Sequence, residues 1–161
     1  MKVIYPGSFD PITKGHMDII ERISDKFDEV VVAVLVNSEK NNLFTLEERK
    51  QLIKQEIKDY GLKNVTIESF DGLLIEFAKK IGSKIIVRGL RAISDYEYEL
   101  QIAHINSKLY EGLETIFLVS KAEYSYISSS VVKEVASYKG DISTFVSENV
   151  AEKIMDKLIG G

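Results

Sequence analysis

The chain has 161 residues, of which 45% are hydrophobic and 29% charged, so it is long enough to bury a core and has the composition of a globular protein. Its net charge of −4 excludes a broadly basic surface, and we expect no nucleic-acid partner. The lack of cysteine excludes disulfides, thiolate metal sites and a cysteine nucleophile. The two histidines, His16 and His104, lie far apart in the sequence, so no histidine-rich metal site is expected.

The sequence shows no targeting or membrane segment. Only two apolar residues follow Lys2 before the turn at Tyr5-Pro6-Gly7, which does not fit a signal peptide. The longest apolar run, residues 30–36, is too short to span a bilayer. We find no linker, low-complexity tract or repeat, and therefore expect one cytoplasmic domain over residues 1–161 without membrane contact.

Strands and helices alternate along the chain. In the first half we expect a strand at residues 3–5, a helix at 14–23, a strand at 30–36, a helix from 45 to about 59 and a strand at 65–68. In the second half we expect a helix at 72–81, a strand at 84–87, a helix from 94 to about 109, a strand at 115–119, a helix from 128 to about 138 and a helix at 150–158. The β-branched run at 30–36 indicates a strand buried on both faces, and the patterns at 45–48 and 94–97 indicate capping boxes.

This alternation predicts an α/β fold, namely a Rossmann-like, doubly wound, five-stranded parallel sheet with helices on both faces. Ligands of such sheets bind beyond the carboxyl ends of the strands. The loops at that edge are expected at residues 6–16, 37–44, 70–74, 88–94 and 120–130.

The first of these loops leads from a strand, through a turn with Gly7, into a helix that begins near Gly15 and His16. Free N–H groups at a helix start carry partial positive charge and bind anions, and Ser8 and His16 add side-chain donors. The stretch matches neither a Walker loop nor the dinucleotide-binding pattern of glycines. The alternative is that the glycine only marks a turn and that His16 caps the helix or packs locally.

The other loops add positive charge and hydroxyl groups. Lys40 follows the second strand, Arg88 and Arg91 follow the fourth, and residues 128–130 form a triple serine at a helix start. Together they predict a phosphate or polyphosphate site, although the serines alone also fit a simple N-cap. No nucleophile with an adjacent base is evident, so the set suits transfer of a nucleotidyl or phosphoryl group between two bound anions. On the long fourth helix, we expect His104 and the tyrosines to serve packing or subunit contacts.

Two motifs resemble the signatures of the nucleotidyltransferase superfamily. Residues 13–16 (TKGH) are similar to its T/HxGH motif, and residues 127–130 (ISSS) are similar to its second motif. Within the superfamily, the stretches YPGSFDPITKGH, FTLEER, VRGLRAISDYEYELQIAHIN and SYISSSVVKEVASYKGDIS resemble the bacterial phosphopantetheine adenylyltransferases. The resemblance extends over essentially the whole chain.

The resemblance implies transfer of AMP from ATP to 4′-phosphopantetheine by direct in-line attack. The products are dephospho-CoA and pyrophosphate, and the reaction belongs to coenzyme A biosynthesis. It also implies Mg²⁺ bound with ATP, feedback binding of CoA and a homo-oligomer that is a hexamer. No protein-borne metal ligands are expected, since Asp10 is the only acid in the first loop.

Site residues follow from the same resemblance. His16 is implied as the transition-state stabiliser, assisted by Lys40 and Arg91. The implied ATP-binding residues are Ser8, Phe9, His16, Gly89, Leu90, Arg91, Glu99, Tyr124, Ser125, Tyr126, Ile127, Ser128, Ser129 and Ser130. The implied phosphopantetheine-binding residues are Ser8, Lys40, Leu74 and Arg88.

Several alternatives stay open on the sequence alone. Relatives in the superfamily adenylylate nicotinate mononucleotide or cytidylylate glycerol phosphate, so a different acceptor substrate is one alternative. A nucleotide-sensing domain without catalysis is another. A third alternative is that Lys40 shares its role with Lys14. The residue pattern by itself indicates that Glu99 is a solvated charge on a helix.

Overall fold

The computed structural model describes residues 1–36 and 41–160, and the strands in this part of the chain form one parallel sheet. The strands are β1 (Lys2–Gly7), β2 (Glu29–Leu35), β3 (Val65–Phe70), β4 (Ile85–Leu90) and β5 (Glu114–Val119). Their order is β3-β2-β1-β4-β5, and all neighbouring pairs are parallel. The chain therefore winds outward from β1 in one direction and then returns to start β4 on its other side. The loops after β1 and β4 diverge there, which creates a crevice at the sheet edge.

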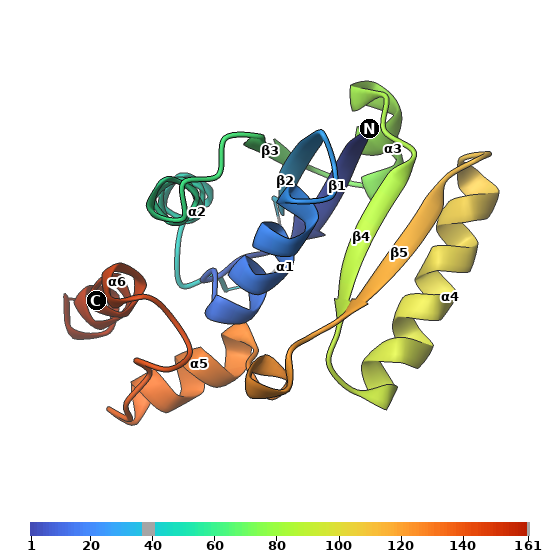
Figure 1. Ribbon diagram of the computed structural model, residues 1–161. Coiled ribbons are helices and arrows are strands. Elements are labelled where there is room, and N and C mark those ends of the chain that lie inside the picture. The colour runs from blue at the N-terminus through green and yellow to red at the C-terminus, as the bar shows by residue number, and fades with distance from the viewer. Residues whose placement is uncertain (37–40, 161) are drawn as a thin grey trace.

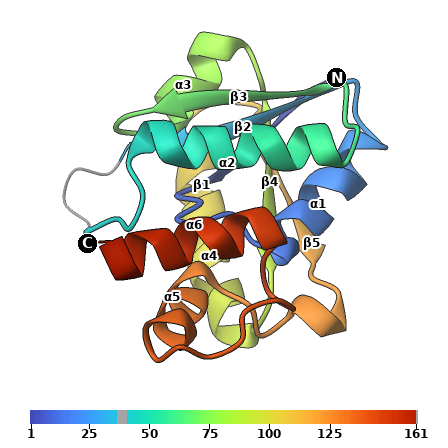
Figure 2. The same ribbon diagram turned by 90° about the vertical axis from the view of Figure 1, so that its left-hand side faces the viewer.

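Helices cover both faces of the sheet, which confirms the predicted doubly wound α/β fold (Figures 1 and 2). They are α1 (Lys14–Ser24), α2 (Leu46–Asp59), α3 (Leu74–Ile81), α4 (Ile93–Leu109), α5 (Ser129–Ser137) and α6 (Glu148–Gly160). One face packs against α1, α2, α5 and α6, while α3 and α4 lie on the other. Within the described residues, every helix is too short or too polar to cross a bilayer.

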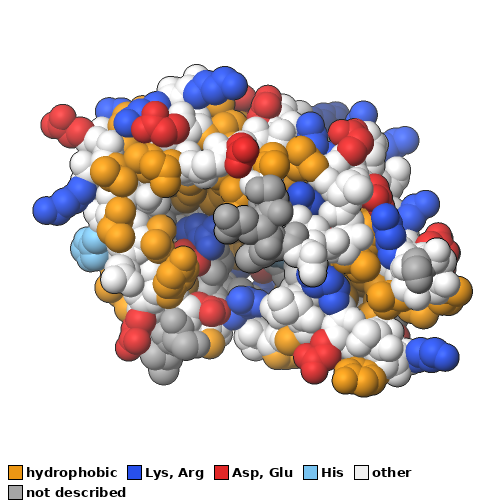
Figure 3. Space-filling view, turned by 180° about the vertical axis from the view of Figure 1, so that it is seen from behind, with side chains coloured by type: hydrophobic (Ala, Val, Ile, Leu, Met, Phe, Trp, Pro, Cys, Tyr) orange, Lys and Arg blue, Asp and Glu red, His pale blue; other side chains and the backbone are white. Residues whose placement is uncertain are grey.

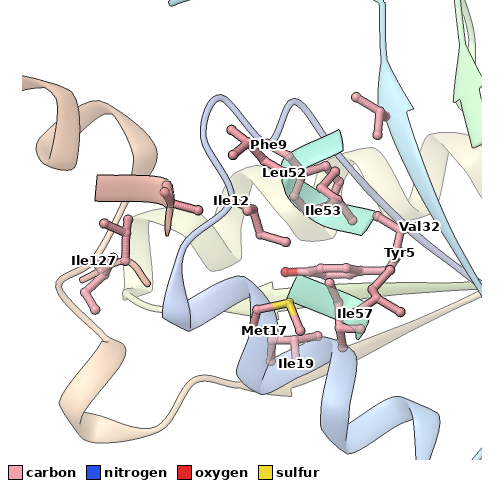
Figure 4. Packing of buried hydrophobic residues seen from close by; sticks show 14 of the residues in the cluster. Tyr5, Phe9, Ile12, Met17, Ile19, Val32, Leu52, Ile53, Ile57 and Ile127 are labelled. Atoms are coloured by element: carbon pink, nitrogen blue, oxygen red, sulfur yellow. The ribbon is translucent and has the colours of Figure 1, made fainter. Parts of the chain in front are cut away.

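The larger hydrophobic core lies between the sheet and α1, α2, α5 and α6. β2 is buried on both faces, as predicted, because Val32 packs into this core whereas Val31 and Ala33 pack into the smaller core under α3. Figure 4 shows that Ile12, from the loop after β1, and Ile127, from the loop after β5, also point into the larger core. Two loops that were predicted to bind anions are thus anchored by apolar packing.

Several element boundaries differ from the prediction, among them the ends of β1 and β4 and the start of α3. β4 continues to Leu90 rather than ending at residue 87, because its pairing with β5 extends to Leu90 opposite Val119. α3 begins at Leu74 rather than at Gly72, whose φ of 82° is incompatible with a right-handed helix. β1 extends to Gly7, paired with Val34 of β2.

Of the two predicted capping boxes, one is confirmed and one is wrong. At the start of α2, the Glu48 N–H donates to Thr45 Oγ1 at 3.2 Å and the Thr45 N–H reaches Glu48 Oε1 at 3.5 Å. α4 instead begins at Ile93, after Ala92 as an N-cap without a side-chain hydrogen bond, so the pattern at residues 94–97 lies inside the helix. Ala92 is the last extended residue after β4, and the chain turns into the helix there.

Candidate active site

A cavity of about 440 Å³ lies at the crevice between the loops that follow β1 and β4. Figure 3 shows basic side chains in the hollow near the centre of the face in view. Twelve of the predicted site residues line it: Ser8, Phe9, His16, Arg88, Gly89, Arg91, Glu99, Tyr124, Ile127, Ser128, Ser129 and Ser130. The described lining does not include Leu74, Leu90, Ser125 or Tyr126, and Lys40 lies outside the described residues. The sheet topology has therefore brought most of the predicted residues to one place.

His16 forms part of the cap of α1. Thr13 is the N-cap, and the His16 N–H donates to its Oγ1 at 3.3 Å, while the Thr13 N–H donates to His16 Nδ1 at 3.0 Å. Nδ1 is therefore an acceptor, and the neutral ring carries its proton on Nε2. The local capping role considered from the sequence is confirmed, but it uses only one ring nitrogen. Nε2 is left as a donor on a side chain that lines the cavity.

The surroundings of His16 keep its ring neutral. Burial lowers the pKa of His16 to about 4, and the positive charges of Arg91 and Arg88 act in the same direction. The ring packs edge-on against Phe9, with 4.9 Å between ring centroids. Phe9 is buried and has a φ of 49°, a left-handed conformation that is uncommon for a non-glycine residue and marks a tightly determined turn. At neutral pH the cavity thus presents an uncharged hydrogen-bond donor beside two guanidinium groups.

Arg88 is held by a carboxylate from α4. Its Nε donates to Glu99 Oε2 at 2.8 Å and its Nη2 to Oε1 at 2.6 Å, while Nη1 donates to the Pro6 carbonyl at 3.1 Å. The side chain of Glu99 is only 12% exposed, so the interpretation of Glu99 as a solvated charge is wrong. Its position one turn after Tyr96, which packs against Phe117 of β5, shows that this face of α4 is turned to the sheet.

Arg91 joins two loops of the cavity. Its Nη1 donates to the Ile127 carbonyl at 2.9 Å, and its Nε lies 3.4 Å from Asp95 Oδ2. The Arg91 side chain therefore connects the loop after β4 to the loop after β5. Asp95 also lines the cavity. Its i,i+4 spacing from Arg91 was a local signal that the sequence prediction did not use, whereas the contact with the carbonyl 36 residues away could not be identified from local sequence patterns.

The triple serine fulfils the capping role considered for it and also lies at the cavity. Ser128 is the N-cap of α5, since its Oγ accepts from the Val131 N–H at 3.1 Å. Ser129 Oγ donates to the Pro11 carbonyl at 2.7 Å and joins the start of α5 to the loop after β1. All three serines line the cavity, so the start of α5 faces the same space as His16. Two helix starts, those of α1 and α5, thus converge on one cavity.

A buried carboxylate fixes the loop that precedes α2. Asp10 is 3% exposed, and its Oδ1 accepts from the Phe44 N–H while its Oδ2 accepts from the Leu43 N–H, both at 2.9 Å. Lys133 of α5 donates to the same Oδ2 at 3.0 Å. The sequence prediction named Asp10 only as the acid of the first loop, and it missed Lys133, which lines the cavity.

Two further expectations concern lysine and metal binding. Lys14 Nζ donates to the Ser143 carbonyl at 2.8 Å, and the described lining does not include it, so the alternative role beside Lys40 is not supported. Among residues 1–36 and 41–160, no group of three His, Cys, Asp or Glu side chains is placed to hold a metal ion. Both oxygens of Asp10 are already engaged, which leaves this carboxylate poorly suited to a metal.

Comparisons with known proteins agree with this geometry. Residues 4–135 match the model of the cytidylyltransferase-like family. The chain is 55% identical to a phosphopantetheine adenylyltransferase of Lachnoclostridium phytofermentans, over 99% of this chain and 98% of that protein. It is 54% identical to a phosphopantetheine adenylyltransferase of Alkaliphilus metalliredigens, over 98% and 99% of the two chains.

Among solved structures, the fold is similar to that of the Plasmodium falciparum nicotinic acid mononucleotide adenylyltransferase complexed with NaAD. The TM-score is 0.70 over 99% of this chain and 94% of that one, at 15% sequence identity, which supports the fold alone. The family match and the relatives together cover nearly the whole sequence. The chain therefore belongs to the cytidylyltransferase-like family and, within it, to the phosphopantetheine adenylyltransferases.

Proposed function

We propose that this chain transfers AMP from ATP to 4′-phosphopantetheine, forming dephospho-CoA and pyrophosphate, as a step of coenzyme A biosynthesis. The observation that carries the proposal is the convergence of two helix starts, a neutral histidine and two arginines on one cavity. Such a cavity can hold two phosphate-bearing reactants side by side and needs little covalent chemistry of its own.

The state of His16 favours direct attack over a covalent intermediate. Its Nδ1 accepts from Thr13, and Nε2 of the neutral ring carries a proton, so the ring offers no free base to activate a serine. An oxygen of the acceptor phosphate attacks the α-phosphorus of ATP, and the bond from that phosphorus to the bridging oxygen breaks as pyrophosphate leaves. His16 Nε2 donates to the α-phosphate as charge develops on its oxygens.

The other residues position the two reactants. Arg91 and the start of α5 bind the nucleotide, while Ser8 and Arg88 bind the acceptor phosphate. Lys40 is assigned to the space between the phosphates by family resemblance, as Leu74 is to the pantetheine arm. Mg²⁺ would arrive bound to ATP, where it would neutralise charge on the phosphates.

The exposed side of α4 supports a homo-oligomer, which we propose to be a hexamer. Hydrophobic side chains gather over α4, on the left of the view in Figure 3. They include Tyr98, Ile105 and Leu109, with exposed fractions of 62%, 48% and 51%. A partner chain would bury this surface. CoA, which contains the product, would bind the same cavity as a feedback ligand.

The decisive experiment incubates the chain with MgATP and each candidate acceptor and follows pyrophosphate release, with the product identified by mass spectrometry. We expect release with 4′-phosphopantetheine only. Release with nicotinate mononucleotide but not with 4′-phosphopantetheine would overturn the assignment. ATP binding without release in the presence of any acceptor would instead identify a nucleotide-sensing domain.

A further inference from the structure

The first residue of α1 is held by a segment that follows α5, far along the chain. Lys14 donates its backbone N–H to the Phe145 carbonyl and its Nζ to the Ser143 carbonyl, both at 2.8 Å. His16 lies two residues further on in the same helical turn, and it lines the cavity. Residues 141–147, here called the α5–α6 connection, do not belong to the described lining of the cavity. The connection therefore contacts the start of α1 from outside the cavity.

The α5–α6 connection is itself anchored in the molecule. Ile142 and Val146 are buried and pack into the larger hydrophobic core. Ser147 Oγ donates to the buried carboxylate of Glu56 on α2. Because these contacts fix the connection on both sides of its two acceptor carbonyls, the carbonyls are held in place for the start of α1.

An anchor at Lys14 bears on His16 because the first N–H groups of a helix have no partner within it, so helix ends fray. In α1 the Lys14 N–H has its acceptor in the connection, and the His16 N–H has Thr13 Oγ1 as its acceptor. Thr13 also orients the ring, since its own N–H donates to His16 Nδ1 at 3.0 Å. A shift of Lys14 would move the adjacent Thr13 and, with it, the direction in which His16 Nε2 points.

We propose that the α5–α6 connection positions His16, and that Lys14 is the positioning residue through which it acts. The inference rests on the proposed function, since it concerns the donor to the α-phosphate. Without the anchor, the ring would adopt directions in which Nε2 misses the phosphate, so kcat would fall while the reactants still bind. One competing role is a contact that only stabilises the fold. Another is an action on the nucleotide loop, because the Phe145 and Tyr126 rings pack edge to face with 6.0 Å between centroids.

Lys14→Pro tests the anchor. Proline is tolerated at the first position of a helix, and the extended conformation of Thr13 (φ −120°, ψ 170°) suits a residue that precedes proline. The substitution removes the backbone donor together with Nζ, whereas Lys14→Ala removes Nζ alone. We expect kcat to fall about tenfold in Lys14→Pro and about twofold in Lys14→Ala, with KM for ATP and 4′-phosphopantetheine within about twofold of wild type.

Glu148→Pro is the matched control. Glu148 is exposed and is the first residue of α6, after the capping Ser147, so the change places proline at the equivalent position of another helix. In the part of the chain that the structure describes, the Glu148 N–H has no hydrogen bond that the proline would remove. We expect kcat of this variant to equal that of wild type.

Nitrogen NMR of the histidine rings distinguishes positioning from stabilisation. The chain has 2 histidines, so selective isotope labelling gives ring signals from His16 and His104 alone. In wild type we expect the His16 signals of an acceptor Nδ1 and a protonated Nε2. In Lys14→Pro we expect these two signals to move toward each other, because a ring that is no longer held exchanges between its two tautomers. The His104 signals should not change.

A lower Tm in Lys14→Pro, with unchanged kcat and unchanged His16 signals, would show a purely stabilising contact and overturn the proposal. A raised KM for ATP with unchanged kcat would overturn it as well, since the connection would then act on the nucleotide. If Lys14→Pro does not fold, Asp141→Ala loosens the connection instead, because the Asp141 carboxylate accepts from the Ser143 N–H at 2.9 Å. The same fall in kcat and the same change in the His16 signals are expected there.

The failure of this proposal and that of the proposed function are distinguishable. If the wild-type chain converts 4′-phosphopantetheine and Lys14→Pro leaves both kcat and the His16 signals unchanged, only the role of the connection is wrong. If the wild-type chain shows no turnover but the His16 signals change in Lys14→Pro, the positioning of the ring stands and the proposed reaction fails.

Discussion

Two sides of the cavity are built in contrasting ways. One, the α5 wall, comprises residues 8–16 and 127–133, and its apolar residues Phe9, Ile12 and Ile127 are buried in the larger core. Ser129 and Lys133 join its two segments through Pro11 and Asp10. The other, the α4 wall, comprises residues 88–99, and none of the described side chains of α4 is buried in the chain.

The difference indicates how each wall obtains its rigidity. The α5 wall is rigid within one chain, because packing and polar contacts hold it from both ends. The α4 wall is held by the Arg88–Glu99 pair and the Arg91–Ile127 hydrogen bond, and in the proposed oligomer a partner chain would cover the outer surface of α4. If the proposed oligomer dissociates, we therefore expect the catalytic role proposed for His16 to be retained better than the acceptor binding proposed for Arg88.

The largest effect is expected from His16→Ala in the α5 wall. Turnover should fall ~100-fold or more, because one preorganised donor to the transition state is lost. Steady-state pyrophosphate release measures it. Thr13→Ala is the control: it removes the Oγ1 cap of α1 but keeps the backbone N–H that orients the ring, so turnover should fall much less. Near-wild-type turnover in His16→Ala would remove His16 from the mechanism.

A smaller effect is expected from Glu99→Gln in the α4 wall. Arg88 stays but loses its charged, bidentate partner, so KM for 4′-phosphopantetheine should rise about tenfold while kcat changes less. Arg88→Ala combined with Glu99→Gln should be little worse than Arg88→Ala alone, since the two residues act as one unit. Additive losses would show that Glu99 contributes independently of Arg88.

Next in size is Ile105→Asp, on the exposed side of α4. A buried, unpaired charge would oppose association, so sedimentation should show a smaller species. KM for the acceptor should rise a few-fold, which is a smaller increase than the one expected for Glu99→Gln. Tyr138→Asp, at an 82% exposed position after α5, is the control and should leave the assembly intact. Unchanged sedimentation of Ile105→Asp would remove this part of α4 from the interface.

The smallest effect concerns the pH dependence of stability. Folding lowers the pKa of His16 to about 4 from an ordinary value near 6.5, so between these values the unfolded chain binds a proton that the folded chain does not. The free energy of unfolding should therefore be highest above pH 6.5 and fall as pH decreases toward 4. Urea titrations should show a smaller decrease for His16→Gln than for wild type. Equal slopes would mean that His16 titrates normally in the folded chain.

The sequence predicted the local features of this molecule well. The order of strands and helices and the caps at Thr45 and Ser128 follow from periodicity and short-range hydrogen bonding. The turn before α1, which is predicted to bind an anion, also lies where the sequence pattern placed it, between β1 and α1. By contrast, Asp10 and Lys133 are 123 residues apart, and nothing near either residue indicates that they meet. The extension of β4 to Leu90 likewise depends on a partner strand, so composition alone placed its end too early.

The hydrogen bond from the Thr13 backbone to His16 Nδ1 limits what can stand at position 16. The side chain must accept on one edge and donate on the other while holding a fixed direction. Histidine meets all three demands with one rigid ring, whereas glutamine carries both groups on a flexible stem and lysine offers no acceptor. Because the main-chain N–H of Thr13 donates to Nδ1, replacing neighbouring side chains cannot move the ring's proton from Nε2 to Nδ1. The start of α1 therefore fixes which ring nitrogen of the proposed catalytic histidine carries the proton.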